Sequence, residues 1–247
     1  MTVNPTNENE TRDTILDGSI TLIQPKHGYR FSIEAILLAR FAHAHARDRV
    51  LELGAGCGVV SIMMATVYRP RKVVAIEIQQ ALAEMIDRSA AINGLKSVHA
   101  VFADLRQKNI AGVEPASFDL VVANPPYRAA ASGRENPDHG RRVARGEGAT
   151  VLGDFVAASR RYARTSGRVA FICAARRSAE LISAMRSKQL EPKRIRFVHP
   201  RIAMPASVML VEARVGGGIE AAIEPPLILY ERPGIYTAEV RALLSSS

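Results

Sequence analysis

Short runs of apolar residues alternate with longer amphipathic stretches from residue 49 onward. The short runs are rich in Val and Ile, which favour strands, whereas the longer stretches repeat apolar residues at the spacing of a helix face. Alternation of this kind is typical of a parallel sheet covered by helices. The pattern therefore predicts an α/β fold with a seven-stranded, mostly parallel sheet and helices on both faces.

The boundaries of these elements follow from the same pattern. One expected helix ends at Asn93-Gly94, which is a normal C-terminal signal. The expected strands are 49–53, 72–77, 98–103, 118–123, 168–173, 194–199 and 207–214. The expected helices are 33–41, 58–68, 79–92, 151–164 and 178–188, with Ser32 as the N-cap of the first.

The length of 247 residues suits one large domain and is short for two. Residues 1–13 are polar and are expected to form a flexible tail, whereas residues 14–247 are expected to form a single domain. Within that domain, 14–48 is an N-terminal segment and 49–247 is the core. The stretch 128–150 lacks apolar periodicity and is expected to be a long basic loop of the core.

Three alternate glycines, Gly54, Gly56 and Gly58, follow the first strand of the predicted core. Glycines let the chain turn tightly and approach a ligand without a Cβ atom in the way. An acid stands at the carboxyl end of each of the next two strands. Glu77 is the last residue of the second strand, and Asp104 directly follows the third. The first carboxylate can accept both hydroxyls of a ribose, and the second can accept a hydrogen bond from an adenine amino group. Together they predict a nucleoside-binding site.

The glycine spacing bears on which nucleoside cofactor fits. A dinucleotide site carries Gly-x-Gly-x-x-Gly, which seats a pyrophosphate on a helix N-terminus. This chain has Gly-x-Gly-x-Gly instead. The spacing favours a cofactor without phosphate groups.

A tetrapeptide, Asn124-Pro125-Pro126-Tyr127, directly follows the fourth predicted strand of the core. If the Asn124 side-chain oxygen and the Pro125 carbonyl each accept one N–H of a planar amino group, they favour a pyramidal nitrogen and stabilise the charge that develops on it. The prolines stiffen the turn, and Tyr127 offers a ring on which a planar base or amide can stack. The motif predicts an acceptor site for an amino nitrogen whose lone pair is delocalised.

Positive charge is concentrated in the second half of the chain. The formal net charge is +9, and residues 128–201 contain 17 Lys and Arg against 6 Asp and Glu, so this band alone carries +11. Such a band is suited to a polyanion, and a solvated arginine-rich surface is the other interpretation. The arginines expected to contact phosphate groups of such a polyanion are Arg128, Arg134, Arg141, Arg142 and Arg145.

Two cysteines, Cys57 and Cys173, lie far apart and show no zinc-ligand spacing, so no metal site is expected. No apolar run approaches the ~18 residues that a membrane span needs, and the first residues carry no apolar signal core. We therefore expect a cytoplasmic protein that is not bound to a membrane. The sequence leaves the oligomeric state open and is compatible with a monomer.

The glycine turn and the two acids resemble the cofactor half of class I, Rossmann-like methyltransferases. The resemblance implies S-adenosylmethionine as the cofactor, with the glycines and Glu52 near its methionine portion, Glu77 at the ribose and Asp104 at the adenine. The full set that it implies is Glu52, Gly54, Gly56, Gly58, Glu77 and Asp104. The tetrapeptide is similar to the amino-methyltransferase motif of adenine-N6 and protein-glutamine-N5 enzymes, which implies catalytic roles for Asn124, Pro125, Pro126 and Tyr127.

Two further segments, 24–38 and 230–240, resemble the bacterial tRNA1(Val) adenine-37-N6 methyltransferase family. The resemblance implies methylation of an adenine in RNA, at position 37 of a tRNA anticodon loop, with tRNA or another structured RNA as the partner. That family often has Asp where this chain has Glu34, and its loop is less rich in arginine than 129–150. The departures leave another RNA adenine open as the target.

Two other functions are compatible with parts of the sequence. A glutamine-N5 methyltransferase acting on a release factor would share the tetrapeptide, but its relatives carry a sizeable helical domain before the glycine strand, and about 48 residues precede that strand here. A catalytically silent RNA-binding module of the same fold would not need the geometry of Asn124 to Tyr127. RNA methylation is therefore the leading hypothesis.

Overall fold

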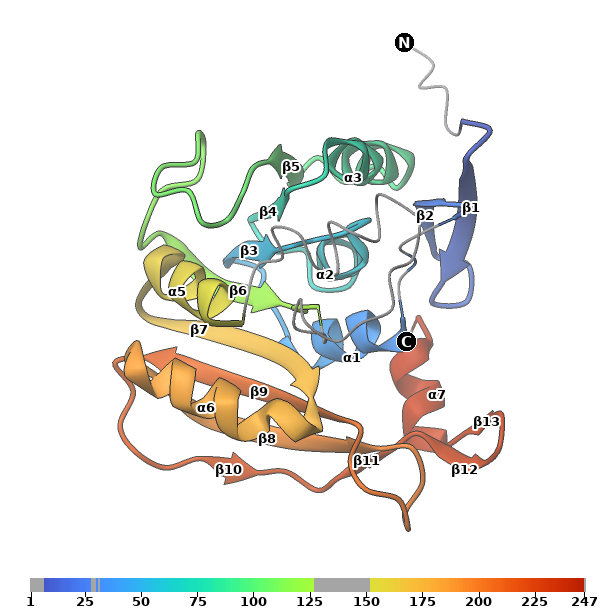
Figure 1. Ribbon diagram of the computed structural model, residues 1–247. Coiled ribbons are helices and arrows are strands. Elements are labelled where there is room, and N and C mark those ends of the chain that lie inside the picture. The colour runs from blue at the N-terminus through green and yellow to red at the C-terminus, as the bar shows by residue number, and fades with distance from the viewer. Residues whose placement is uncertain (1–6, 28–29, 31, 127–151, 247) are drawn as a thin grey trace.

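The computed structural model describes residues 7–27, 30, 32–126 and 152–246, and one large sheet runs through its centre (Figure 1). The strands lie in the order β10-β8-β9-β7-β6-β3-β4-β5, and β11 also pairs with β8. The long strands are β3 (Arg49–Leu53), β4 (Lys72–Glu77), β5 (Val98–Phe102), β6 (Phe118–Ala123), β7 (Ala163–Ala174), β8 (Leu190–His199) and β9 (Val208–Val215). The short strands are β10 (Ala222–Ile223) and β11 (Leu227–Ile228).

Most neighbouring strands of this sheet are parallel. The strands β5, β4, β3, β6 and β7 pair in parallel, and β9 runs antiparallel between β7 and β8. The prediction of an α/β fold with a mostly parallel sheet is confirmed. All seven predicted strands are present, and β3, β4 and β6 have the predicted bounds, whereas β10 and β11 were not predicted.

Helices cover both faces of the sheet, as predicted. The helices on one face are α1 (Ile33–Ala42), α2 (Val59–Val67) and α3 (Gln80–Ile92), and those on the other are α5 (Leu152–Tyr162) and α6 (Ser178–Ser187), which follows a 3-10 turn (Ala175–Arg177). Successive strand residues point to opposite faces. Val50 therefore packs in the core under α1 and α2, and Leu51 packs in the core under α5 and α6.

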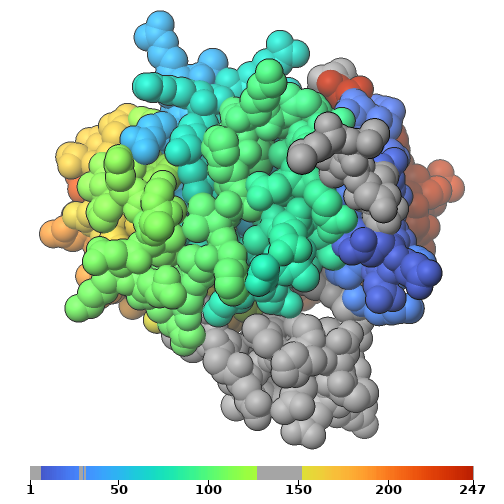
Figure 2. All heavy atoms as spheres, turned by 90° about the horizontal axis from the view of Figure 1, so that it is seen from above, coloured from blue at the N-terminus to red at the C-terminus, as the bar shows by residue number. Residues whose placement is uncertain are grey.

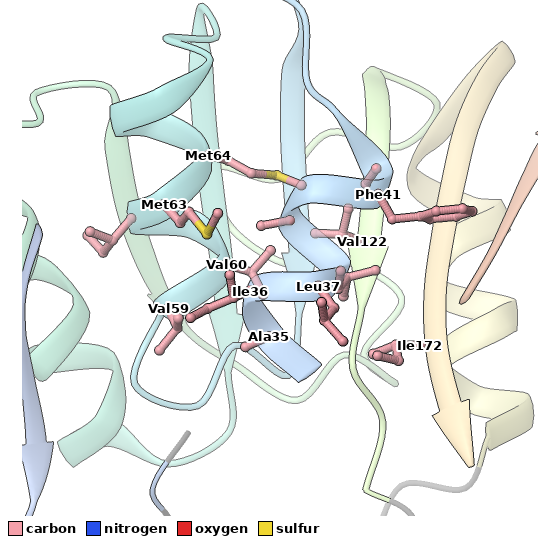
Figure 3. Packing of buried hydrophobic residues seen from close by; sticks show 14 of the residues in the cluster. Ala35, Ile36, Leu37, Phe41, Val59, Val60, Met63, Met64, Val122 and Ile172 are labelled. Atoms are coloured by element: carbon pink, nitrogen blue, oxygen red, sulfur yellow. The ribbon is translucent and has the colours of Figure 1, made fainter. Parts of the chain in front are cut away.

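The core between α1, α2 and the sheet is densely packed (Figure 3). Leu37 of α1, Met63 of α2 and Val122 of β6 are almost completely buried in it. Burial of a side chain of this size contributes roughly 1.5–3 kcal/mol to stability. The packing holds α1 and α2 firmly against the sheet. It also fixes the turn between β3 and α2 and the turn that follows β6.

Ser32 precedes α1 with extended backbone angles, φ −113° and ψ 168°, so its place as the N-cap is confirmed. Its side chain makes no capping hydrogen bond to the first turn, which corrects the predicted role. The Ser32 hydroxyl donates instead to a carboxylate oxygen of Glu34 at 2.8 Å.

A β-hairpin precedes α1 and packs beside α3, as both views of the molecule show (Figures 1 and 2). Its strands are β1 (Glu10–Ile15) and β2 (Ile20–Pro25), paired antiparallel. A flexible tail was predicted for residues 1–13, and this is wrong for residues 10–13, which lie in β1. Residues 1–6 are outside the described part of the chain.

Side chains of α3 hold the hairpin in place. Asn93 accepts from the backbone amide of Thr21 at 3.0 Å and donates to its carbonyl at 2.6 Å. The hydroxyl of Ser89 accepts from the amide of Ile23 at 2.9 Å. These contacts bond a strand edge that would otherwise lack partners in the protein, so the hairpin is an integral part of the fold.

The last elements of the chain return to α1. A second hairpin, β12 (Tyr230–Arg232) with β13 (Ile235–Tyr236), leads into α7 (Ala238–Leu244). The Thr237 hydroxyl caps α7 by accepting from the amide of Val240 at 3.3 Å. In the described ranges, the longest and most apolar helices still fall short of what a membrane crossing requires.

Candidate cofactor and acceptor site

Four neighbouring strands end at the same edge of the sheet. Leu53 at the end of β3 pairs with Ala123 at the end of β6 and with Ile76 near the end of β4. Glu77 at the end of β4 pairs with Phe102 at the end of β5. The segments that follow these strands therefore leave the sheet side by side, where open parallel sheets bind ligands.

The turn after β3 contains the three predicted glycines. Gly54, Gly56 and Gly58 have φ values of +65°, +57° and +80°, a backbone region that side chains disfavour. A Cβ atom on Gly58 would lie 2.7 Å from a side-chain carbon of Ile86, and one on Gly54 would lie 3.0 Å from the ring of Phe155. Backbone conformation and close packing both require glycine at these two positions.

Glu77 ties the glycine turn to the end of β4. One carboxylate oxygen accepts from the Gly56 amide at 2.8 Å, and the other accepts from the Gln79 amide at 2.9 Å. The side chain is buried, and burial raises the pKa of this carboxyl group, although the backbone amides oppose the rise. The predicted ribose acceptor thus also orders the glycine turn.

Glu52 lies inside the protein, one residue before the end of β3, and is 3% exposed. One of its oxygens accepts from the amide of Ser61 at 2.9 Å and from its hydroxyl at 2.5 Å. Burial raises the pKa of Glu52 to about 8, and the nearby Glu77 carboxylate adds to the rise. Sequence reasoning missed Ser61, a small polar residue within the apolar run of α2.

Asp104, after β5, is paired with Arg106 two residues later. The Arg106 guanidinium donates to both carboxylate oxygens at 2.5 to 3.0 Å, and the Arg106 amide donates to one of them at 2.9 Å. These hydrogen bonds lower the pKa of Asp104. The acid is therefore held ionised and in a fixed orientation, by a partner that the sequence analysis did not single out.

Two large apolar side chains near these acids are exposed. Ile78, which follows Glu77, is 38% exposed, and Phe102, two residues before Asp104, is 59% exposed. Exposed apolar groups at the ends of two adjacent strands can pack against a flat ligand. Each was missed because an apolar residue in or directly after a buried strand looks like a core residue.

A small pocket joins the end of β6 to the glycine turn. Asn124, Glu52 and Gly54 line it together, and the remaining lining residues are Ala35, Ala55, Cys57, Val59 and Val60. Asn124 is half-buried, whereas Pro125 is buried. The structure therefore brings together residues that were predicted separately for the cofactor and for the acceptor. Tyr127, Arg128, Arg134, Arg141, Arg142 and Arg145 lie outside the described residues.

A chain of polar contacts links the N-terminal hairpin to the glycine turn. The buried Gln24 of β2 donates to Asp13 at 3.0 Å and accepts from the Cys57 thiol at 3.8 Å. Asp13 in turn is paired with Arg30 at 3.0 Å. Cys57 is buried, which raises the pKa of its thiol to about 12. In the described residues, no group of three or more His, Cys, Asp and Glu is placed to hold a metal ion.

Ion pairs neutralise much of the basic band in the part that the structure describes. Residues 152–201 contain twelve Lys and Arg, and at least six of them are in ion pairs. The paired arginines are Arg164, Arg168, Arg177, Arg186, Arg194 and Arg196. Most partners lie outside the band, so the band carries less free charge than its sequence indicates.

Solved structures share this fold. A crystal structure described as a predicted O-methyltransferase from Agrobacterium tumefaciens is 25% identical, has a TM-score of 0.68, and is matched over 85% of this chain and 94% of that one. TYW2 from M. jannaschii, solved in complex with AdoMet, is 15% identical with a TM-score of 0.57, over 85% and 86% of the two chains. The fold is the class I, Rossmann-like methyltransferase fold.

Two bacterial proteins named tRNA1(Val) (adenine(37)-N6)-methyltransferase are similar in sequence. The one from Parabacteroides distasonis is 26% identical over 196 residues, 78% of this chain and 79% of that protein. The one from Pedobacter heparinus is 24% identical over 219 residues, 87% of this chain and 89% of that protein.

A family profile described as the methyltransferase small domain matches residues 33–184. The match begins at α1, includes the glycine turn, both acids and Asn124, and covers more than half of the chain. The protein therefore belongs to the methyltransferase small domain family and is a methyltransferase.

Proposed function

We propose that the protein transfers a methyl group from S-adenosylmethionine to N6 of an adenine in RNA, namely adenine 37 in the anticodon loop of a tRNA. The observation that carries this proposal is that Asn124 lines the same small pocket as Glu52 and Gly54. An amide group at the acceptor side thus lies beside the turn assigned to the cofactor. The names of the two sequence relatives support adenine and tRNA as the acceptor.

The residues at the strand ends fit the cofactor. S-adenosylmethionine supplies an electrophilic methyl group on a positively charged sulfonium. Glu52 places a buried carboxyl group next to the glycine turn, where a cationic ligand favours its ionised form. Each oxygen of Glu77 accepts one amide and keeps a lone pair for a ribose hydroxyl. Asp104 is ionised and can accept from the adenine amino group.

Asn124 and Pro125 act on the acceptor nitrogen. The lone pair of an exocyclic amino group is delocalised into the ring, which makes the nitrogen a poor nucleophile. Two fixed acceptors, the Asn124 side-chain oxygen and the Pro125 carbonyl, favour a pyramidal nitrogen and stabilise its developing positive charge. The reaction then needs no strong base. An adenine from an RNA loop reaches Asn124 by leaving its base stack.

Labelled cofactor tests the proposal directly. We expect the protein to label tRNA, with the label recovered as N6-methyladenosine after digestion, and to leave a release factor unlabelled. Label in the release factor alone would make the enzyme a glutamine methyltransferase. Label in neither would favour an RNA-binding module without activity.

The role of Asn124 is tested by substitution. Asn124→Ala should lower kcat by about 10²-fold or more, because one fixed acceptor of the amino group is lost. Cofactor affinity, measured by calorimetry, should stay within about twofold. Asn109→Ala, which alters an exposed asparagine in the loop before β6, is the matched control and should behave like the wild type. Loss of cofactor binding in Asn124→Ala would show that Asn124 serves the cofactor and not the acceptor.

A further inference from the structure

A second hollow lies at the opposite end of the strands from the candidate site. It is formed where β3, β4 and β5 begin, because Arg49 pairs with Lys72 and Val73 pairs with Val98 in the sheet. The residues that line it are Arg49, Arg71, Lys72, Lys96, Ser97 and His99. Four cations and one histidine from three separate segments of the chain therefore share one concave surface.

Three of these cations have no acidic partner in the part of the chain that the structure describes. Arg71, Lys72 and Lys96 make no side-chain ion pair there. Arg49 has one distant partner, Glu114, at 3.7 Å, and that carboxylate is 76% exposed. Like charges held this close raise the local potential and attract counter-ions. The hollow is therefore strongly electropositive.

Asp119, an acid beside Arg49, does not neutralise the hollow. Asp119 accepts from the backbone amide of Arg49 at 2.8 Å and is paired with Arg164 at 2.6 Å. The arginines of β7 and β8 are also mostly paired, as Arg168 and Arg194 show. The hollow therefore differs from these two strands, because several of its neighbouring cations have no acidic partner among the described residues.

The hollow is too far from the candidate site to serve the same ligand group. Lys72 and Glu77 mark the two ends of β4, and five residues of strand span about 17 Å. We propose that this hollow binds phosphate groups of the substrate RNA that lie outside the nucleotide entering the acceptor pocket. The proposal rests on the RNA substrate proposed above. It gives the enzyme a second contact, which positions a folded RNA without reading its sequence.

Paired substitutions test the hollow. Arg71→Ala/Lys96→Ala should weaken tRNA binding roughly tenfold at moderate salt and reduce the slope of log K against log salt by about 1–2, because fewer counterions are released. The kcat at saturating tRNA should not change. Glu114→Gln should tighten binding, since it frees Arg49. The matched control is Lys188→Ala/Arg214→Ala, which removes two exposed cations, one beside β8 and one in β9. Strands β7 and β6 separate β9 from β3, so this variant should leave affinity and slope unchanged.

Each other outcome separates the two proposals. If the wild type methylates tRNA while Arg71→Ala/Lys96→Ala binds it with unchanged affinity and slope, the hollow is not an RNA contact and the proposed function stands. If the wild type neither binds nor methylates RNA, both proposals fail. Binding of inorganic phosphate is measured as well as tRNA binding and methylation. If the double variant loses phosphate binding but not RNA binding, the hollow holds a free anion, which overturns the RNA contact.

Discussion

The most constrained single residue near the candidate site is Gly58, the last glycine of the turn. Its φ is +80°, and an added Cβ would meet Ile86 at 2.7 Å. Ile86 is fully buried in the core, where side chains are closely packed. Gly58→Ala therefore carries two penalties, a left-handed backbone for a residue with a side chain and an overpacked core.

We expect Gly58→Ala to lower the free energy of unfolding by roughly 2–5 kcal/mol in urea denaturation. Gly94→Ala is the matched control, because Gly94 also has a positive φ, +68°, but an added Cβ there meets nothing within 4 Å. The control should lose only about 1–2 kcal/mol. Equal losses in the two variants would show that the contact with Ile86 is unimportant.

Glu52 gives the protein a specific dependence on pH. In the unfolded chain its carboxyl group ionises near 4.5, whereas burial raises the pKa of the folded state to about 8. Between these values the folded protein keeps a proton that the unfolded chain has lost. The contribution of Glu52 to stability therefore falls as pH rises from 4.5 to about 8 and is constant above that.

Glu52→Gln removes the carboxyl group that titrates. Relative to the wild type, the variant should gain up to about 1.4 kcal/mol per pH unit across that window, measured as the difference in free energy of unfolding from roughly pH 5 to 9. Glu84→Gln, which alters an exposed glutamate of α3, is the matched control for the loss of one carboxyl group. A difference that does not change with pH for Glu52→Gln would mean that Glu52 is ionised in the folded protein.

At the scale of elements, the strands of the core could be predicted because their signals are local. The run Val50 to Leu53 ends at a glycine, and the run Leu120 to Ala123 ends at Asn124-Pro125. Strands buried on both faces have nearly continuous apolar runs, interrupted in β3 only by Glu52, so composition and turn residues define both ends. The bounds of β3 and β6 therefore matched the prediction.

The N-terminal hairpin could not be predicted in the same way. Residues of β1 are mostly polar, and the buried Glu10 accepts two hydrogen bonds from Arg88 of α3, at 2.6 and 2.8 Å. Thr21 and Ile23 likewise depend on side chains of α3 that are far away in the sequence. Tertiary contacts stabilise the hairpin, and local patterns do not record them.

The residues of the candidate site also fall into two groups: those that local sequence patterns predict and those that depend on tertiary contacts. Glu77 and Asp104 were predictable because an acid after a buried strand must lie at the edge of the sheet. The partners of these acids are the Gly56 amide and Arg106. They could not be predicted, because each contact depends on how the turn after the strand folds. Gln24 belongs to this second group, since its contact with Cys57 joins two elements that the sequence treats separately.

At the scale of the whole molecule, the distribution of charge depends on pairs between distant elements. Arg168 of β7 is the clearest case. Its guanidinium pairs with Asp48 at 2.8 Å and with Glu212 of β9 at 3.3 Å, and it donates to the carbonyl of Ala42 at the end of α1 at 2.9 Å. A count of charges along the sequence includes this arginine in the basic band 128–201, but in the fold its charge is paired and it ties three parts of the protein together.

Arg168→Ala should therefore destabilise the whole molecule. The side chains of Asp48 and Glu212 are only 12% and 10% exposed. Removing the arginine leaves Asp48 without its cation and Glu212 with only Arg194, at 3.8 Å, at a cost of roughly 3–5 kcal/mol in the free energy of unfolding. Arg164→Ala on the same strand is the control, because that side chain is 49% exposed and its pair with Asp119 should contribute less than about 1 kcal/mol. If Arg168→Ala also adds Asp48→Asn and Glu212→Gln, part of the lost stability should return, since no unpaired charge remains. A single variant as stable as the control would mean that solvent reaches these carboxylates and that the network does not hold the sheet to α1.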